Sequence, residues 1–147
     1  MKDLAGEHPT LAAELMTIMA SGNALDEQDR KTDAQALYQQ AWDALPEPKL
    51  EWVPLSSWVT GSLFNLHFDQ GDFQTARQWA QRMLESRESD IDTGPWVNMG
   101  MACLELGQRA EAYRYFEDAH RVGKARAFQD RPKKYLDFYR DASKAGL

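Results

Sequence analysis

Cysteine and histidine are the side chains of this sequence best suited to act as nucleophile, base or metal ligand, and the chain has one cysteine and three histidines. Cys103 and His67 occupy equivalent positions in the repeat described below, so a thiolate activated by an imidazole is the one catalytic arrangement to weigh. Both positions are expected to point between helices, whereas a catalytic thiolate must be accessible. His8 and His120 are too far away in the pattern to complete a metal site. We therefore expect packing roles, no enzyme activity, no metal and no cofactor.

The elements that would hold these residues are indicated by a repeated spacing of small and aromatic residues. Counted from Thr93 as position 1, Gly100 stands at position 8, Gly107 at position 15, Ala112 at position 20 and Phe116 at position 24. Two antiparallel helices can touch closely only where position 8 and the start of the second helix carry almost no side chain. The pattern resembles the tetratricopeptide repeat, a helix-turn-helix motif of 34 residues.

The same pattern can be placed twice more upstream, starting at Leu15 and at Ser57. The first copy has Gly22 at position 8 but Asp29 where the turn glycine is expected, and the second copy has Phe64 at position 8. The sequence therefore predicts an all-α, tetratricopeptide-like α-solenoid in a single domain, residues 1–147. Its three helix-turn-helix repeats are expected over about residues 15–48, 57–90 and 93–126.

Prolines interrupt the helical pattern in two places. Pro46, Pro48 and Pro54 cannot continue a helix, so they predict a linker after the first repeat. Asp130 followed by Pro132 is typical of a helix start. Aromatic residues then recur at helical spacing, and we expect a C-terminal capping helix over about residues 131–145 that covers the last repeat. A partner-binding role for this aromatic stripe is the alternative.

Charge is unevenly distributed along the chain. Residues 1–92 carry a net charge of −9 and residues 93–147 a net charge of +3. The basic residues near the C-terminus have the charge to contact phosphate, but no groove-reading motif accompanies them and the whole chain is acidic. We therefore expect a protein partner and regard nucleic-acid binding as the weaker interpretation. These basic residues are Arg121, Lys124, Arg126, Arg131, Lys133 and Lys134.

The apolar stretch at residues 11–20 is interrupted by Glu14 and Thr17 and has no basic leader. It is therefore predicted to be neither a signal peptide nor a membrane span. The single cysteine, Cys103, excludes an internal disulfide and suits a reducing compartment. We expect a cytoplasmic protein without membrane contact, and the sequence leaves its oligomeric state open.

Positions 2, 5, 6, 9, 12 and 13 of each first helix line the concave side of such stacks. The groove predicted from them is acidic, has apolar contacts and lacks lysine and arginine, which favours a basic region of a partner. The methionines could equally belong to the core and the acidic residues to a solvated face. Trp58 could be a partner contact or pack against the proline-rich linker. The candidate partner-binding residues are Met16, Met19, Asn23, Asp26, Glu27, Trp58, Ser62, Asn65, Asp69, Asn98, Met101 and Glu105.

Two longer stretches carry a more specific resemblance. Leu-Pro-Glu-Pro-Lys at residues 45–49 and Pro-Lys-Lys-Tyr at residues 132–135 resemble sequences of small bacterial tetratricopeptide proteins that act as immunity partners of secreted polymorphic toxins. The resemblance covers roughly residues 15–140. It implies a non-catalytic toxin inhibitor, an immunity protein that binds and neutralises a cognate toxin. A general adaptor or scaffold that binds a peptide segment of its partner is the alternative.

Overall fold

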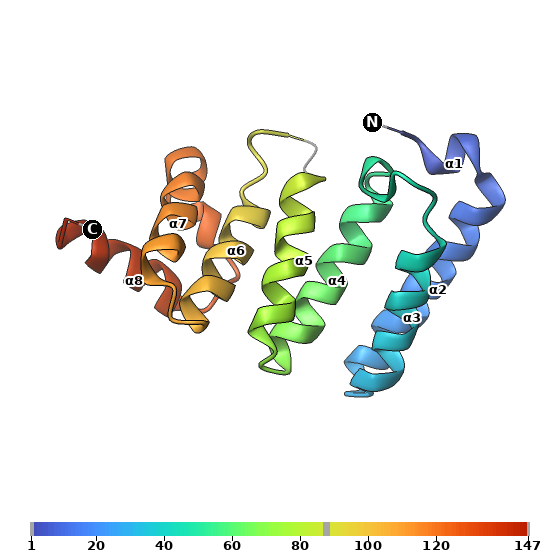
Figure 1. The fold of residues 1–147 in the computed structure, drawn as a ribbon, viewed down its shortest axis with the longest axis horizontal. Helices are drawn as coiled ribbons and strands as arrows, with labels where there is room; N and C mark the ends of the chain where they lie inside the picture. The colour runs from blue at the N-terminus through green and yellow to red at the C-terminus, as the bar shows by residue number, and fades with distance from the viewer. Residues whose placement is uncertain (1, 87–88, 147) are drawn as a thin grey trace. The chain divides into compact units, whose positions relative to one another are not determined.

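The computed structural model describes residues 2–86 and 89–146. Every regular element in these ranges is a helix, and no strand occurs among them, so the prediction of an all-α protein is confirmed (Figure 1). The chain divides into two compact units, Met1–Glu88 and Ser89–Leu147. We call them the N-terminal unit and the C-terminal unit. The division falls two residues before the expected end of the second predicted repeat, residues 57–90.

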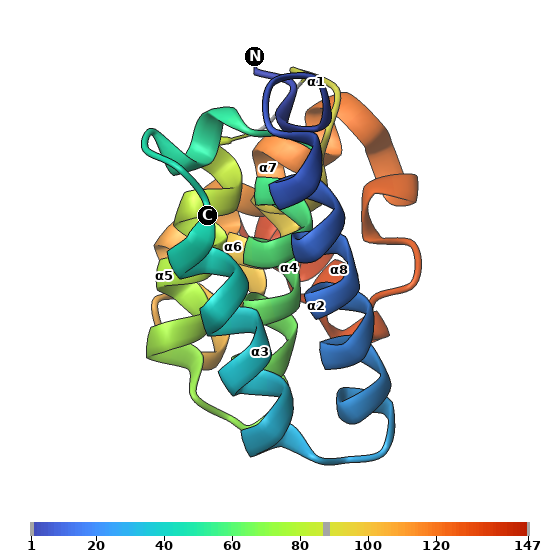
Figure 2. The ribbon, with the colours of Figure 1, turned by 90° about the vertical axis from the view of Figure 1, so that its right-hand side faces the viewer.

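Two helix pairs make up most of the N-terminal unit. Helix α2 packs against α3, α4 packs against α5, and α3 also contacts α4. Figure 2 shows α2 and α3 side by side, joined by a short turn. The predicted proline-rich linker lies between α3 and α4 and contains one short 3₁₀ helix, η1. The elements are α1 (Leu4–Glu7), α2 (Pro9–Glu27), α3 (Lys31–Ala44), η1 (Lys49–Glu51), α4 (Leu55–Asp69) and α5 (Phe73–Glu85).

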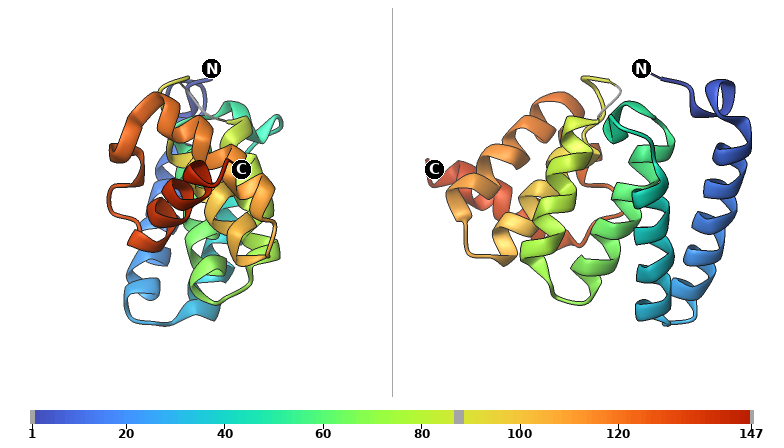
Figure 3. Two further views of the ribbon diagram at one scale, coloured as in Figure 1. Left: turned by 90° about the vertical axis from the view of Figure 1, so that its left-hand side faces the viewer. Right: turned by 45° about the vertical axis from the view of Figure 1, so that its right-hand side comes forward.

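The C-terminal unit contains one helix pair and a terminal helix (Figure 3). Its elements are α6 (Gly94–Glu105), α7 (Arg109–Gly123), η2 (Lys124–Phe128) and α8 (Lys133–Lys144). Helix α8 lies within the range expected for a capping helix and packs against α7 and η2. The predicted start signal is wrong in detail. Asp130 has φ 65°, and the residue at the N-cap of α8 is Pro132, without a side-chain cap.

The turns inside the three helix pairs share one backbone conformation. Asp29, Gly71 and Gly107 have φ of 61°, 80° and 79°. Each donates its N–H to the carbonyl three residues earlier at 3.0 Å, and the next residue donates to the carbonyl five residues earlier at 2.9 Å. This pair of bonds is the Schellman helix ending. Aspartate tolerates the left-handed conformation, so Asp29 supplies the turn geometry without glycine.

Close helix contacts depend on glycine at two of the three equivalent positions. A Cβ added to Gly22 would lie within 3.0 Å of two ring carbons of Tyr38, and one added to Gly100 within 3.0 Å of three ring carbons of Phe116. In the middle pair the large and the small residue are exchanged between the two helices. Phe64 replaces the glycine, Ala80 replaces the aromatic residue, and both are buried. The expected close approach at position 8 is therefore present where glycine occurs.

Candidate partner-binding face

Helices α2 and α4 are neighbours in the N-terminal unit and carry most of the predicted contact residues. Their spacing at three and four residues places these side chains along one side of each helix. We call this side the α2–α4 face. It consists of Met16, Asn23, Asp26, Glu27, Trp58, Ser62, Asn65 and Asp69, which are exposed or half-buried.

The face has an apolar end at Met16 and Trp58. These side chains are 53% and 36% exposed, which is unusual for large apolar groups in the described part of the chain. Met16 also borders a cavity of about 120 Å³ lined mainly by apolar residues, including Leu55. The proline-rich linker is held by another tryptophan, since Trp52 donates its indole N–H to the carbonyl of Pro46 at 2.8 Å. The exposed part of the Trp58 ring is accessible to a partner.

The middle of the face is organised around the hydroxyl of Tyr38, which comes from α3. It donates to Asn23 Oδ1 at 2.7 Å. Burial raises the pKa of Tyr38 to about 12, Asp26 adds to the shift, and a hydrogen bond with Ser62 opposes it. Asn23 and Ser62, from neighbouring helices, are therefore brought together by one buried phenol. The amide oxygen of Asn23 is engaged inside the chain.

The other end of the face is acidic and includes one lysine that the sequence reasoning missed. Lys31 Nζ pairs with Asp26 Oδ1 and lies 3.9 Å from Asp69 Oδ2. The hydrogen bond with Asp26 raises the pKa of Lys31 against the opposing effect of desolvation, and Asp69 and Asp29 raise it further. Two carboxylates, Asp26 and Asp69, lie beside one ammonium group, so these three side chains together carry a net negative charge. Asp69, with 58% of its side chain exposed, is open to a partner, whereas Asp26 is only 21% exposed.

Met19 is wrong as a contact residue, because its side chain is fully buried in the structure. It lies on α2 three residues after Met16, which is exposed, and three residues before Gly22, which is buried like Met19. A helix that packs on one side buries one stripe and exposes the next. Met19 belongs to the buried stripe, which is the core alternative considered for the methionines.

The three predicted residues of α6 are contacted by a C-terminal segment of the chain itself, and Asn98 and Met101 are wrong as contact residues because they are buried. Arg131 Nη1 donates to Asn98 Oδ1 and lies 3.3 Å from Met101 Sδ. Glu105 Oε2 accepts the Tyr135 hydroxyl at 3.0 Å and pairs with Lys134 Nζ at 2.8 Å. Asn98 and Met101 are buried and Glu105 is half-buried. The chain's own segment 131–135 covers this side of α6.

The two residues weighed as a catalytic pair, His67 and Cys103, lie in the interior. His67 is buried on α4, with Nδ1 3.5 Å from Asp72 Oδ2, and burial lowers its pKa more than the carboxylate raises it. Cys103 is fully buried on α6, in the other unit. Its thiol is therefore inaccessible to a substrate. Among the described residues no group of three or more histidine, cysteine, aspartate or glutamate side chains could hold a metal ion.

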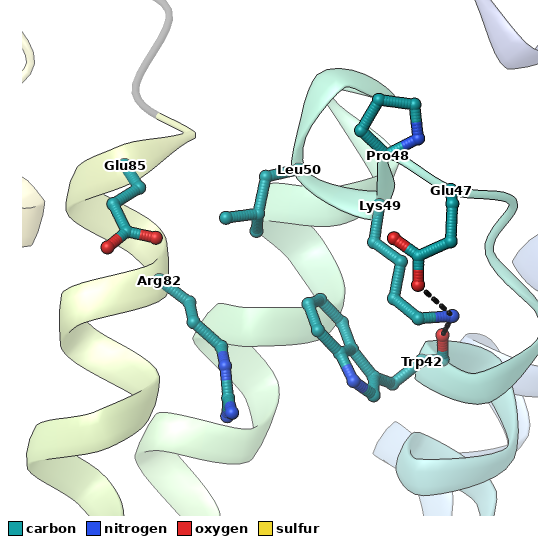
Figure 4. A pocket seen from close by; sticks show the side chains of 7 residues that line it. All are labelled: Trp42, Glu47, Pro48, Lys49, Leu50, Arg82 and Glu85. Atoms are coloured by element: carbon teal, nitrogen blue, oxygen red, sulfur yellow. Dashed lines mark hydrogen bonds and ion pairs between the residues drawn. The ribbon is translucent and has the colours of Figure 1, made fainter.

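A second hollow of the N-terminal unit lies beside the proline-rich linker (Figure 4). This surface pocket has a volume of about 440 Å³ and is lined by residues that include Trp42, Lys49 and Arg82. Lys49 Nζ donates to the carbonyls of Trp42 at 3.0 Å and Leu45 at 2.7 Å, which ties the linker to the end of α3. The Arg82 guanidinium lies 4.3 Å from the centre of the Trp79 ring. Lys49 is thus engaged in holding the linker, and the Arg82 guanidinium lies against a ring of its own helix, α5.

No protein-family model matches the chain, and no curated protein matches it significantly. A search of the described residues also finds no helix with the length and apolar character needed to cross a membrane. The functional interpretation therefore depends on the α2–α4 face and on the sequence resemblance given above.

Proposed function

We propose that this chain is a tetratricopeptide-like binding protein that neutralises a bacterial toxin in the cytoplasm. It acts without turnover, by occluding a basic region of the toxin with the α2–α4 face. The observation that carries the proposal is the combination of exposed apolar side chains at one end of this face with the accessible Asp69 at the other. The toxin as partner is suggested by the sequence resemblance alone.

The repeat architecture supports the proposal. Three helix pairs with the same Schellman turn and with matched small and large residues are the expected building blocks of a solenoid, because each repeat covers its apolar stripe with a neighbour. We propose that the three pairs stack as tetratricopeptide repeats and that α8 caps the last one. In such stacks the first helices line a continuous binding surface, to which α2 and α4 would contribute.

The two ends of the face are expected to act on different steps of binding. A tryptophan that becomes fully buried in an interface is a frequent hot spot, and its removal mainly accelerates dissociation. An exposed carboxylate such as Asp69 mainly accelerates association with a basic surface, and this effect weakens with salt. Trp58→Ala and Asp69→Lys therefore separate the two contributions.

The test is capture of the partner from the native host, followed by expression of that partner in a sensitive strain. We expect the captured protein to arrest growth, wild-type chain to restore growth, and the Trp58→Ala/Asp69→Lys variant to fail in both capture and rescue. Glu14→Lys is the matched control, because Glu14 is exposed on α2 and lies on the opposite side from Asn23. A captured partner that does not arrest growth would favour the adaptor function, and capture that the double variant leaves unchanged would refute the face.

A further inference from the structure

The C-terminal unit contains a basic segment bound along the first helix of a pair. Arg131 contacts Asn98 and Met101, and Lys134 and Tyr135 contact Glu105. The contacts run from the middle of α6 to its last residue. Arg131 is half-buried, and this burial lowers its pKa while Asp130 only partly opposes the shift. The chain thus provides its own example of how a basic segment occupies this side of a first helix.

Helix α4 presents equivalent positions in the N-terminal unit. Gly71 and Gly107 have nearly the same φ and make the same turn hydrogen bonds, 36 residues apart in sequence. The same offset relates Ser62 to Asn98, Asn65 to Met101 and Asp69 to Glu105. A carboxylate therefore ends both helices at the equivalent place; Ser62 and Asn65 precede it on α4, and Asn98 and Met101 precede it on α6.

The two helices differ in what covers them. On α6 these positions are buried or half-buried beneath residues 131–135, whereas on α4 Asn65 and Asp69 are exposed. Asp69 lies 3.9 Å from Lys31, a long contact for an ion pair, and 58% of its side chain is exposed. A pair with this separation and an exposed carboxylate contributes little, and Lys31 keeps its hydrogen bond with Asp26, so Asp69 can exchange Lys31 for a cation of a partner.

We infer that the partner binds α4 through a segment with the chemistry of residues 131–135, an arginine followed three residues later by a lysine and an aromatic residue. The arginine would donate to the oxygens of Ser62 and Asn65, and the lysine would pair with Asp69. Positions 62 and 69 are separated by roughly 10 Å along a helix. In this chain the equivalent contacts are made by Arg131, before α8, and by Lys134 in the first turn of α8; three residues of a fully extended partner segment also span roughly this distance. The inference rests on the proposed function and specifies the partner's binding segment.

The test uses a fluorescein-labelled peptide of residues 126–136 of this chain, titrated with the full-length protein and followed by fluorescence anisotropy. We expect saturable binding with a Kd below about 1 mM that weakens as salt is raised. Asp69→Lys should weaken it by about tenfold. Glu14→Lys, the charge-matched control, should leave it unchanged. A peptide with glutamate at the positions of Arg131 and Lys134 should not bind.

Two results would overturn the inference. One is the lack of saturable binding to the wild-type chain. The other is binding that Glu105→Lys abolishes and Asp69→Lys leaves intact, because the peptide would then be exchanging with the chain's own segment on α6. Neither result affects the outcome of the capture and growth assay, which tests the proposed function separately. If the native partner still depends on Trp58 and Asp69 while the peptide does not bind, the inference fails and the proposed function survives.

Discussion

Replacing Gly100 by alanine tests the close helix contact on which the repeat assignment depends. The new Cβ would lie within 3.0 Å of three ring carbons of Phe116, and ordinary contacts begin at 3.4 Å. The ring has little room to retreat, because Phe128 lies 5.4 Å away and Tyr135 and Phe138 each 6.1 Å away between ring centres. The helices of this pair must therefore separate, or the aromatic cluster must shift.

The expected magnitude follows from two opposing effects. Overpacking of a core costs about 1–3 kcal/mol, while alanine in place of glycine inside a helix gains up to about 1 kcal/mol. We expect Gly100→Ala to destabilise the protein by about 1–2 kcal/mol. Gly22→Ala should cost less. Its Cβ would lie within 3.0 Å of two ring carbons of Tyr38, and no aromatic partner of that ring is among the described contacts.

Gly61→Ala is the matched control, because Gly61 also lies inside a first helix but the added Cβ would meet only Met83 Cε at 3.6 Å. It should stabilise the protein by about 0.5–1 kcal/mol. Urea unfolding followed by circular dichroism measures all three variants. In a Phe116→Leu background, which removes the ring, Gly100→Ala should become neutral or stabilising. If Gly100→Ala stabilises the wild type as much as Gly61→Ala does, the contact is misplaced and the reasoning is refuted.

Three further predictions concern pH and the C-terminal segment. Burial lowers the pKa of His67, so the unfolded chain takes up a proton at a higher pH than the folded chain does. Stability should therefore fall as pH drops below about 6.5. His67→Leu should remove this pH dependence from melting temperatures measured between pH 7.5 and 5. The pKa of Tyr38 is raised to about 12, so stability should fall as pH rises from about 10; Tyr38→Phe should reduce the slope without abolishing it, because Tyr139 is also raised to about 12. Deleting residues 128–147 removes three rings that pack on Phe116 and should destabilise the C-terminal unit by more than about 3 kcal/mol; an unchanged melting curve would contradict the capping role of α8.

The helix pairs could be predicted because their signals are local. A small residue at position 8, a turn residue at position 15 and an aromatic residue at position 24 each report a contact within one pair. Asp29 differs from the glycine expected at the turn, yet it adopts the turn conformation. Phe64 differs from the small residue expected at position 8, but the matching residue on the second helix, Ala80, is small where the other pairs have an aromatic ring. Whether the two helices of a pair can pack closely is therefore predicted better from two facing positions together than from either position alone.

The candidate site was predicted less completely, because its decisive contacts come from outside the first helices. Lys31 begins α3 and reaches Asp26 on α2, so a list of first-helix positions omits it. Arg131 reaches Asn98 across 33 positions of sequence. The basic character of residues 121–134 was visible, but nothing local indicated that part of this segment folds onto α6. Burial of Met19 likewise depends on which stripe of α2 meets its neighbours.

The same contact chemistry has different consequences inside a chain and between chains. Residues 131–135 are tethered to α6 through α7, so their few polar contacts need not overcome the loss of translational and rotational freedom that association of separate molecules entails. That loss is estimated at about 4–15 kcal/mol, so an arginine and a lysine at an exposed helix support only weak binding, of the millimolar order expected for the peptide. A partner bound tightly to α4 therefore needs an apolar contribution as well. Met16 and Trp58 are the exposed apolar side chains on this face, so we expect the partner's basic segment to be accompanied by an apolar group that covers them.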